Sequence, residues 1–69
     1  MSKETVEVLT SLKKEYVELK TKIAGAEATV LIKALDDKST ELLSDQVAAM
    51  KMYAEALETR MKYIVANPE

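Results

Sequence analysis

The chain has 69 residues, with ten Lys and Arg against twelve Asp and Glu, and it contains neither histidine nor cysteine. This length allows one domain. The absence of cysteine excludes disulfides and thiolate metal sites, and the absence of histidine removes the commonest general base. The mildly acidic balance argues against DNA or RNA binding, which needs a positive excess. No apolar run is long enough for a membrane span. The N-terminus lacks the pattern of a signal peptide, so we expect a cytoplasmic protein. We expect no cofactor.

The first predicted helix covers about residues 3–35. Ser2 is a good N-cap for it, and Glu4 would lie in the first turn, where negative charge interacts favourably with the helix dipole. Large side chains recur every seven residues, which keeps them on one side of a helix over several turns. They are Leu9, Tyr16, Ile23 and Val30.

The end of this helix, from Ala24 to Ile32, is small or apolar on nearly every side. A helix that is apolar all round is expected to be buried on more than one side. Gly25 costs up to about 1 kcal/mol relative to alanine inside a helix, and close approach of another backbone would compensate for it. The alternative is a tolerated kink. An apolar patch of this width on so short a chain indicates self-association.

A turn is predicted at residues 36–39, followed by a second helix over about residues 40–66. Asp37 or Ser39 would cap this helix, because Asp and Ser favour caps and turns. Pro68 ends it, since proline disfavours the helical conformation at the residue before it, here Asn67. A second seven-residue repeat marks its apolar side, formed by Leu43, Met50, Leu57 and Ile64.

Two long helices with a short connection predict an all-α antiparallel hairpin. One hairpin can cover one apolar side of each helix but leaves the patch at residues 24–32 open. We therefore expect a homo-oligomer, either a dimer forming a four-helix bundle or a larger ring of hairpins. The predicted interface between copies consists of Leu9, Ile23, Gly25, Val30, Leu31, Leu43, Met50, Leu57 and Ile64.

A polar row, Gln46, Tyr53 and Arg60, runs beside the apolar side of the second helix. Two interpretations stay open. In the first the row is the rim of the bundle, with Tyr53 packing its ring and Arg60 pairing with an acid of the first helix such as Glu15 or Glu18. In the second the row lines a ligand pocket between protomers, because arginine binds phosphate and tyrosine can stack on a base. The first helix would then complete the pocket with Tyr16, Lys13 and Lys20.

Catalysis is not expected. Without His or Cys, a nucleophile would need lysine or a carboxylate as its base. Asp36 and Asp37 are adjacent but lie in the turn, where capping is the simpler role, and Glu55 and Glu58 are expected to face away from the apolar side. We predict no catalytic residue and no metal site.

Two stretches resemble one family. Residues 15–23 fit E-Y-x-E-L-x-x-K-I, and residues 42–60 fit L-L-x-x-Q-x-x-A-M-x-x-Y-x-x-x-L-x-x-R. This pattern resembles a group of small phage and prophage proteins, found in crAss-like and other phages, whose members are helical hairpins without an assigned activity. Family members carry a bulkier end to the first helix, where this chain has Ala24–Ala28.

The expected architecture is also similar to the helical-hairpin sponges with which phages defeat CBASS and Thoeris immunity. That likeness implies a counter-defence protein that sequesters a cyclic or ADP-ribose-derived nucleotide between protomers, without catalysis. The alternative is a small oligomeric protein–protein interaction module, either an inhibitor of a host protein or a structural or regulatory accessory of the phage. The apolar excess at residues 24–32 and the acidic second helix motivate this alternative.

Overall fold

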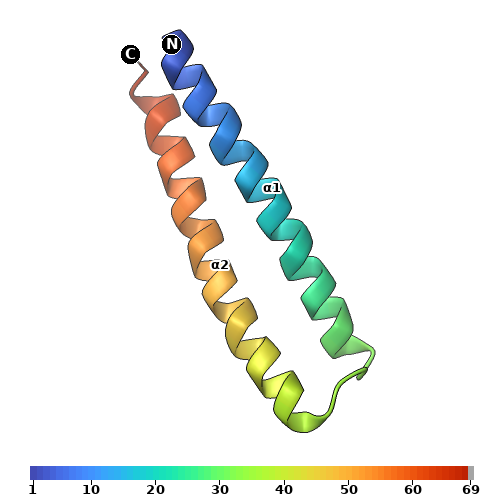
Figure 1. Ribbon diagram of the computed structural model, residues 1–69. Helices are drawn as coiled ribbons and strands as arrows, with labels where there is room; N and C mark the ends of the chain where they lie inside the picture. Colours follow the sequence, from blue (N-terminus) through green and yellow to red (C-terminus); the bar gives the residue numbers. More distant parts are fainter. Residues whose placement is uncertain (69) are drawn as a thin grey trace.

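The chain folds into two antiparallel helices, α1 (Lys3–Leu31) and α2 (Asp37–Ala66), joined by a short connection (Figure 1). The computed structural model describes residues 1–68. These residues form a rod of 50 × 15 × 13 Å with both chain ends at one end and the turn at the other. The prediction of an all-α hairpin is confirmed for the described residues. Within them, no helix is both long and apolar enough to cross a membrane.

The start of α1 follows the prediction. The Ser2 side chain accepts a hydrogen bond from the Thr5 backbone N–H at 3.1 Å, which satisfies one of the free amides of the first turn. Glu4 lies in that turn and interacts favourably with the positive end of the helix dipole.

The end of α1 differs from the prediction, because the helix stops at Leu31 rather than near residue 35. The Ile32 amide still donates to the Ala28 carbonyl at 3.0 Å, but Lys33 adopts a left-handed conformation with φ 54°. That conformation reverses the chain direction, as glycine does at many helix ends. The connection therefore occupies residues 32–36, and not 36–39.

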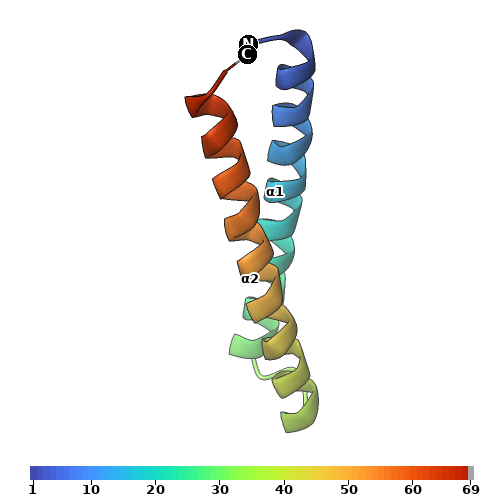
Figure 2. The same cartoon turned by 90° about the vertical axis from the view of Figure 1, so that its left-hand side faces the viewer.

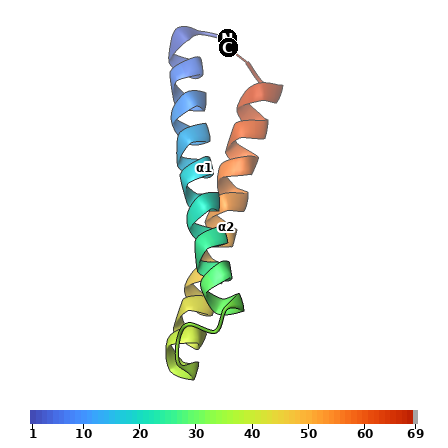
Figure 3. The same ribbon diagram turned by 90° about the vertical axis from the view of Figure 1, so that its right-hand side faces the viewer.

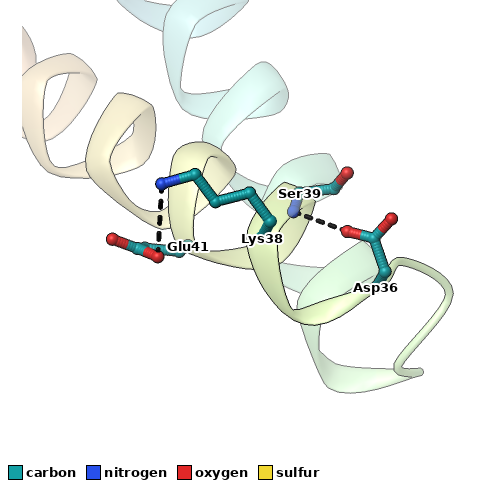
Figure 4. A network of polar contacts seen from close by, with 4 residues as sticks. All are labelled: Asp36, Lys38, Ser39 and Glu41. Carbon is teal, nitrogen blue, oxygen red and sulfur yellow. Dashed lines mark hydrogen bonds and ion pairs between the residues drawn. The ribbon is translucent and has the colours of Figure 1, made fainter.

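Asp36 caps α2, so the expectation that Asp37 or Ser39 would do so is wrong. The Ser39 backbone N–H donates to Asp36 Oδ1 at 2.7 Å, and α2 begins at Asp37 (Figure 4). The backbone hydrogen bond from Ser39 and then the side-chain contact with the same residue lower the pKa of Asp36. A nearby Lys38–Glu41 ion pair, 3.6 Å long, is well exposed and contributes little.

At its other end α2 stops where the sequence indicates. Asn67 is the C-cap residue, and both its backbone N–H and its side-chain Nδ2 donate to the Tyr63 carbonyl at 3.0 Å. These bonds satisfy a carbonyl that the helix itself leaves free. Pro68 follows and prevents continuation of the helix.

The core between the helices is small. The helices cross each other and do not run side by side along their whole length (Figures 2 and 3). Leu57 is fully buried with 0% exposure, and the other buried hydrophobic residues are Leu12, Ile23, Val47 and Ala54. Each large buried side chain contributes about 1.5–3 kcal/mol relative to exposure, so this core stabilises a single hairpin only modestly.

Much of the apolar patch at residues 24–32 is open in the single chain. Leu31 is 81% exposed and Ile32 74% exposed. A Cβ atom added to Gly25 would meet no atom within 4 Å beyond its neighbours and the backbone of its own part of α1. The close backbone approach expected at Gly25 is therefore not made within one hairpin.

Candidate functional site

Two tyrosines of the predicted site bind glutamates of the opposite helix. The Tyr16 hydroxyl donates to Glu58 Oε1 at 3.0 Å, and the Tyr53 hydroxyl donates to Glu15 Oε1. Each hydrogen bond raises the pKa of its phenol, with smaller contributions from desolvation and from the negative charge of the glutamate. Each hydrogen bond therefore favours the neutral phenol and joins the tyrosine to the opposite helix.

These two hydrogen bonds lie on opposite flanks of the hairpin. On α2, Tyr53 and Glu58 are five residues apart, which corresponds to about 140° around the helix axis. Ala54 and Leu57, both buried, lie between them and face α1. We call the two sides the Tyr16 flank and the Tyr53 flank.

The Tyr16 flank carries the lysines of the predicted site. Lys20 Nζ lies over the Tyr16 ring, 6.0 Å from its centroid, at the outer limit of a cation–π contact. Lys13 precedes Tyr16 by three residues and lies on the same side of α1. Further toward the turn, Lys51 forms a 3.0 Å ion pair with Glu27 across the two helices.

The Tyr53 flank carries the rest of the polar row. The positive charge of Arg60 slightly offsets the raised pKa of Tyr53, which places the guanidinium within electrostatic reach of the phenol. Within residues 1–68 Arg60 makes no ion pair, so the expected pairing with Glu15 or Glu18 is not formed, and Glu15 binds Tyr53 instead. Gln46 makes a weak contact of 3.9 Å with the Met50 sulfur.

Within residues 1–68, the grooves near the hairpin's polar residues do not bring the six predicted ligand residues together. Arg60 lines a shallow groove of about 380 Å³ with Glu4, Glu7, Val8, Ser11 and Leu12. A more apolar groove of about 420 Å³ lies beside the turn and is lined by Glu27, Val30, Leu31, Ser44, Val47, Ala48 and Lys51. One chain thus offers two half-sites on opposite flanks. The half-site on the Tyr16 flank consists of Lys13, Tyr16 and Lys20, and the one on the Tyr53 flank consists of Gln46, Tyr53 and Arg60.

The Sequestin family model matches residues 7–63 of this chain. The chain belongs to the Sequestin family. Its match spans both helices and both half-sites, and the name describes sequestration, that is, binding rather than catalysis. Membership agrees with the resemblance to a small phage-type family drawn from the two sequence motifs, and with the likeness of the hairpin architecture to phage nucleotide sponges. Neither the curated proteins nor the solved structures gave a match.

In the single hairpin, the predicted interface residues fall into three groups by exposure. Ile23 and Leu57 are already buried inside one hairpin, so they hold the two helices together. Gly25 and Leu31 are exposed and remain free to contact another copy. The others are half-buried at the edges of the core: Leu9, Val30, Leu43, Met50 and Ile64.

The sequence did not predict that glutamates bind the two tyrosines: Glu15 was expected as a possible partner of Arg60 and binds Tyr53 instead. Glu58 was expected to face away from the apolar side, yet it is half-buried and accepts the Tyr16 hydrogen bond. Its position directly after Leu57 was the available signal, because the next residue on a helix lies only about 100° away and can flank the buried stripe.

Proposed function

We propose that this chain is a phage counter-defence protein that binds a nucleotide immune signal between copies and holds it without cleaving it. The match to the Sequestin family over residues 7–63 is the observation that carries the proposal. The ligand class follows from the polar residues that the two helices expose. The proposed ligand is a cyclic or ADP-ribose-derived nucleotide.

The chemistry of the half-sites supports this ligand class. Arg60, which has no acidic partner within residues 1–68, can bind a phosphate through two parallel hydrogen bonds. Tyr53 is 48% exposed while its hydroxyl is bound to Glu15, so the ring is held in place with part of its surface accessible for stacking on a base. Lys13 and Lys20 supply further positive charge on the other flank.

Calorimetric titration with cyclic ADP-ribose and with a cyclic dinucleotide tests the proposal. We expect saturable binding that Arg60→Ala weakens about ten- to a hundredfold, because a charged hydrogen-bond donor to phosphate is lost. Lys62→Ala is the matched control, since Lys62 is exposed and lies about 200° around the helix from Arg60. Absence of heat with every nucleotide tested would refute the ligand class.

Holding without cleavage is tested on the bound nucleotide itself. After long incubation with excess protein and then denaturation, chromatography should recover the nucleotide intact. Conversion to a new product at a rate proportional to protein concentration would show an enzyme and overturn this part of the proposal.

The groove beside the turn favours a second function, that of a protein–protein interaction module. Its wall combines Val30 and Val47 with the exposed side chains of Leu31 and Ala48, a surface that suits an apolar side chain of a partner. Affinity purification from host lysate tests it. A protein recovered in stoichiometric amount with the wild-type chain, and lost with Ala48→Asp, would support this function over nucleotide binding.

A further inference from the structure

Each helix carries an exposed row with the same seven-residue spacing. The α1 row consists of Thr10, Val17, Ala24 and Leu31, and the α2 row consists of Leu42, Ala49, Ala56 and Tyr63. None of these side chains is covered within the hairpin. Seven-residue spacing of small and apolar residues is typical of helices that pack along another helix.

The two rows lie on opposite flanks. On α1, Glu15, Tyr16 and Val17 follow one another in steps of about 100°, so Val17 lies beyond Tyr16 on the side away from Glu15. On α2, Ala56 and Glu58 lie on the two sides of buried Leu57, so Ala56 is on the side away from Glu58. Since Glu58 binds Tyr16, the α1 row borders the Tyr16 flank and the α2 row borders the Tyr53 flank.

The rows also stand at equal heights along the rod. In an antiparallel pair of helices, a residue one position later on α1 lies at the height of a residue one position earlier on α2. The contacts Tyr16–Glu58, Tyr53–Glu15 and Lys51–Glu27 between the two helices, taken together, place Val17 on average at the height of Ala56. The shared spacing then gives four level pairs: Thr10–Tyr63, Val17–Ala56, Ala24–Ala49 and Leu31–Leu42.

Building on the proposed function, we propose that copies of this chain associate head to tail, with the α1 row of one copy packed on the α2 row of the next at equal height. A single contact of this kind covers both rows of every copy, and it closes into a ring when the rotation between copies permits. The small pair Ala24–Ala49 lets the helices approach closely at the centre of the contact.

Charge favours this pairing over contacts between like helices. Residues 1–35 hold six lysines against five glutamates, a net charge of +1, whereas residues 36–69 hold four basic against seven acidic residues, a net charge of −3. Packing α1 on α1 would also bring Lys13 and Lys20 of two copies together along one seam, where like charges repel each other. Packing α1 on α2 brings halves of opposite net charge together, while Lys13, Lys20 and Arg60 form a local cluster of positive charge at the seam.

The same contact unites the two half-sites at one seam. By the same averaged alignment, Lys13 is level with Arg60 and Lys20 is level with Tyr53. Lys13 and Arg60 make no ion pair within residues 1–68. Cations gathered at a seam repel each other unless an anion lies between them, so the phosphates of a nucleotide stabilise the contact.

Disulfide cross-linking tests the contact independently of any ligand. The chain has no cysteine, so A24C and A49C variants each introduce one thiol. Under mild oxidation, a mixture of A24C and A49C chains should form mixed dimers far faster than either variant alone. The control replaces A49C with A48C, which moves the thiol one residue, about 100°, out of the row. Equal cross-linking by both mixtures, or preferential self-linking of either variant, would overturn head-to-tail packing.

Subunit mixing tests the composite site. The K13A and R60A variants should each bind cyclic ADP-ribose and the cyclic dinucleotide poorly. An equimolar mixture, unfolded and refolded together, should recover about a quarter of the wild-type sites, because random neighbours then pair an intact Lys13 with an intact Arg60. A site within one chain recovers none, which would overturn the composite site. If wild-type protein binds no nucleotide while cross-linking succeeds, the proposed function fails and the contact stands.

Discussion

Leu57 is the side chain on which the stability of the single hairpin depends most, because it is the large side chain with 0% exposure. Leu57→Ala removes its buried methyl groups and leaves a cavity, which costs about 2–5 kcal/mol in well-packed cores. The free energy of unfolding of a chain this short is only about 3–10 kcal/mol. The substitution therefore removes a large fraction of the total stability.

The expected result is a fall in the melting temperature on the order of 10–30 °C, since each 1 kcal/mol shifts the midpoint of so small a domain by about 4–8 °C. Far-ultraviolet circular dichroism during heating and in urea measures it. Met52→Ala serves as the control, because Met52 is 73% exposed and its truncation should change stability by no more than about 0.5 kcal/mol. Equal melting of the Leu57→Ala and Met52→Ala proteins would show that the core is not the one described.

Three further predictions concern the turn and the tyrosines. Lys33→Gly should raise the unfolding free energy by about 0.5–1 kcal/mol in a urea titration, because glycine adopts the left-handed conformation without strain; a loss of stability would contradict the described turn. Asp36→Ala should lower the melting temperature more than Asp37→Ala does, and the reverse order would reassign the cap. The raised pKa of Tyr16 and Tyr53 gives stability that is complete below pH 10.0 and is lost as pH rises through the raised values. The free energy of unfolding, measured across this pH range, should fall less steeply with pH when Tyr16 and Tyr53 are both replaced by Phe. An unchanged slope would contradict the two hydrogen bonds.

The sequence predicted the hairpin well because its main signals are periodic. The seven-residue repeats, the Ser2 cap and the Asn67–Pro68 stop are local features with one dominant structural outcome. The end of α1 was harder, because Lys33 adopts a conformation usually signalled by glycine or asparagine. Neither residue is present near that turn, so the apolar residues up to Leu35 were read as a continuing helix.

The candidate site was predicted in its residues but not in its arrangement. Periodicity places Tyr53 and Arg60 beside the apolar stripe of one helix, yet it does not tell which flank of the other helix they meet. That choice depends on how α1 and α2 rotate against each other, which contacts such as Tyr16–Glu58 fix. The splitting of the site into two flanks therefore became visible only in three dimensions.

The rod has unlike ends, and this polarity has a practical consequence. Both chain ends emerge together at one end, and the connection between the helices lies at the other (Figure 1). Leu31, Ile32 and Leu35, next to or within this connection, are exposed. In an assembly built on the proposed α1-on-α2 contact, all copies point the same way, so every chain end lies on one rim and every apolar turn on the opposite rim. A reporter fused to either terminus would crowd a single rim, whereas a label placed in the turn would mark the other rim and leave the seams between copies unobstructed.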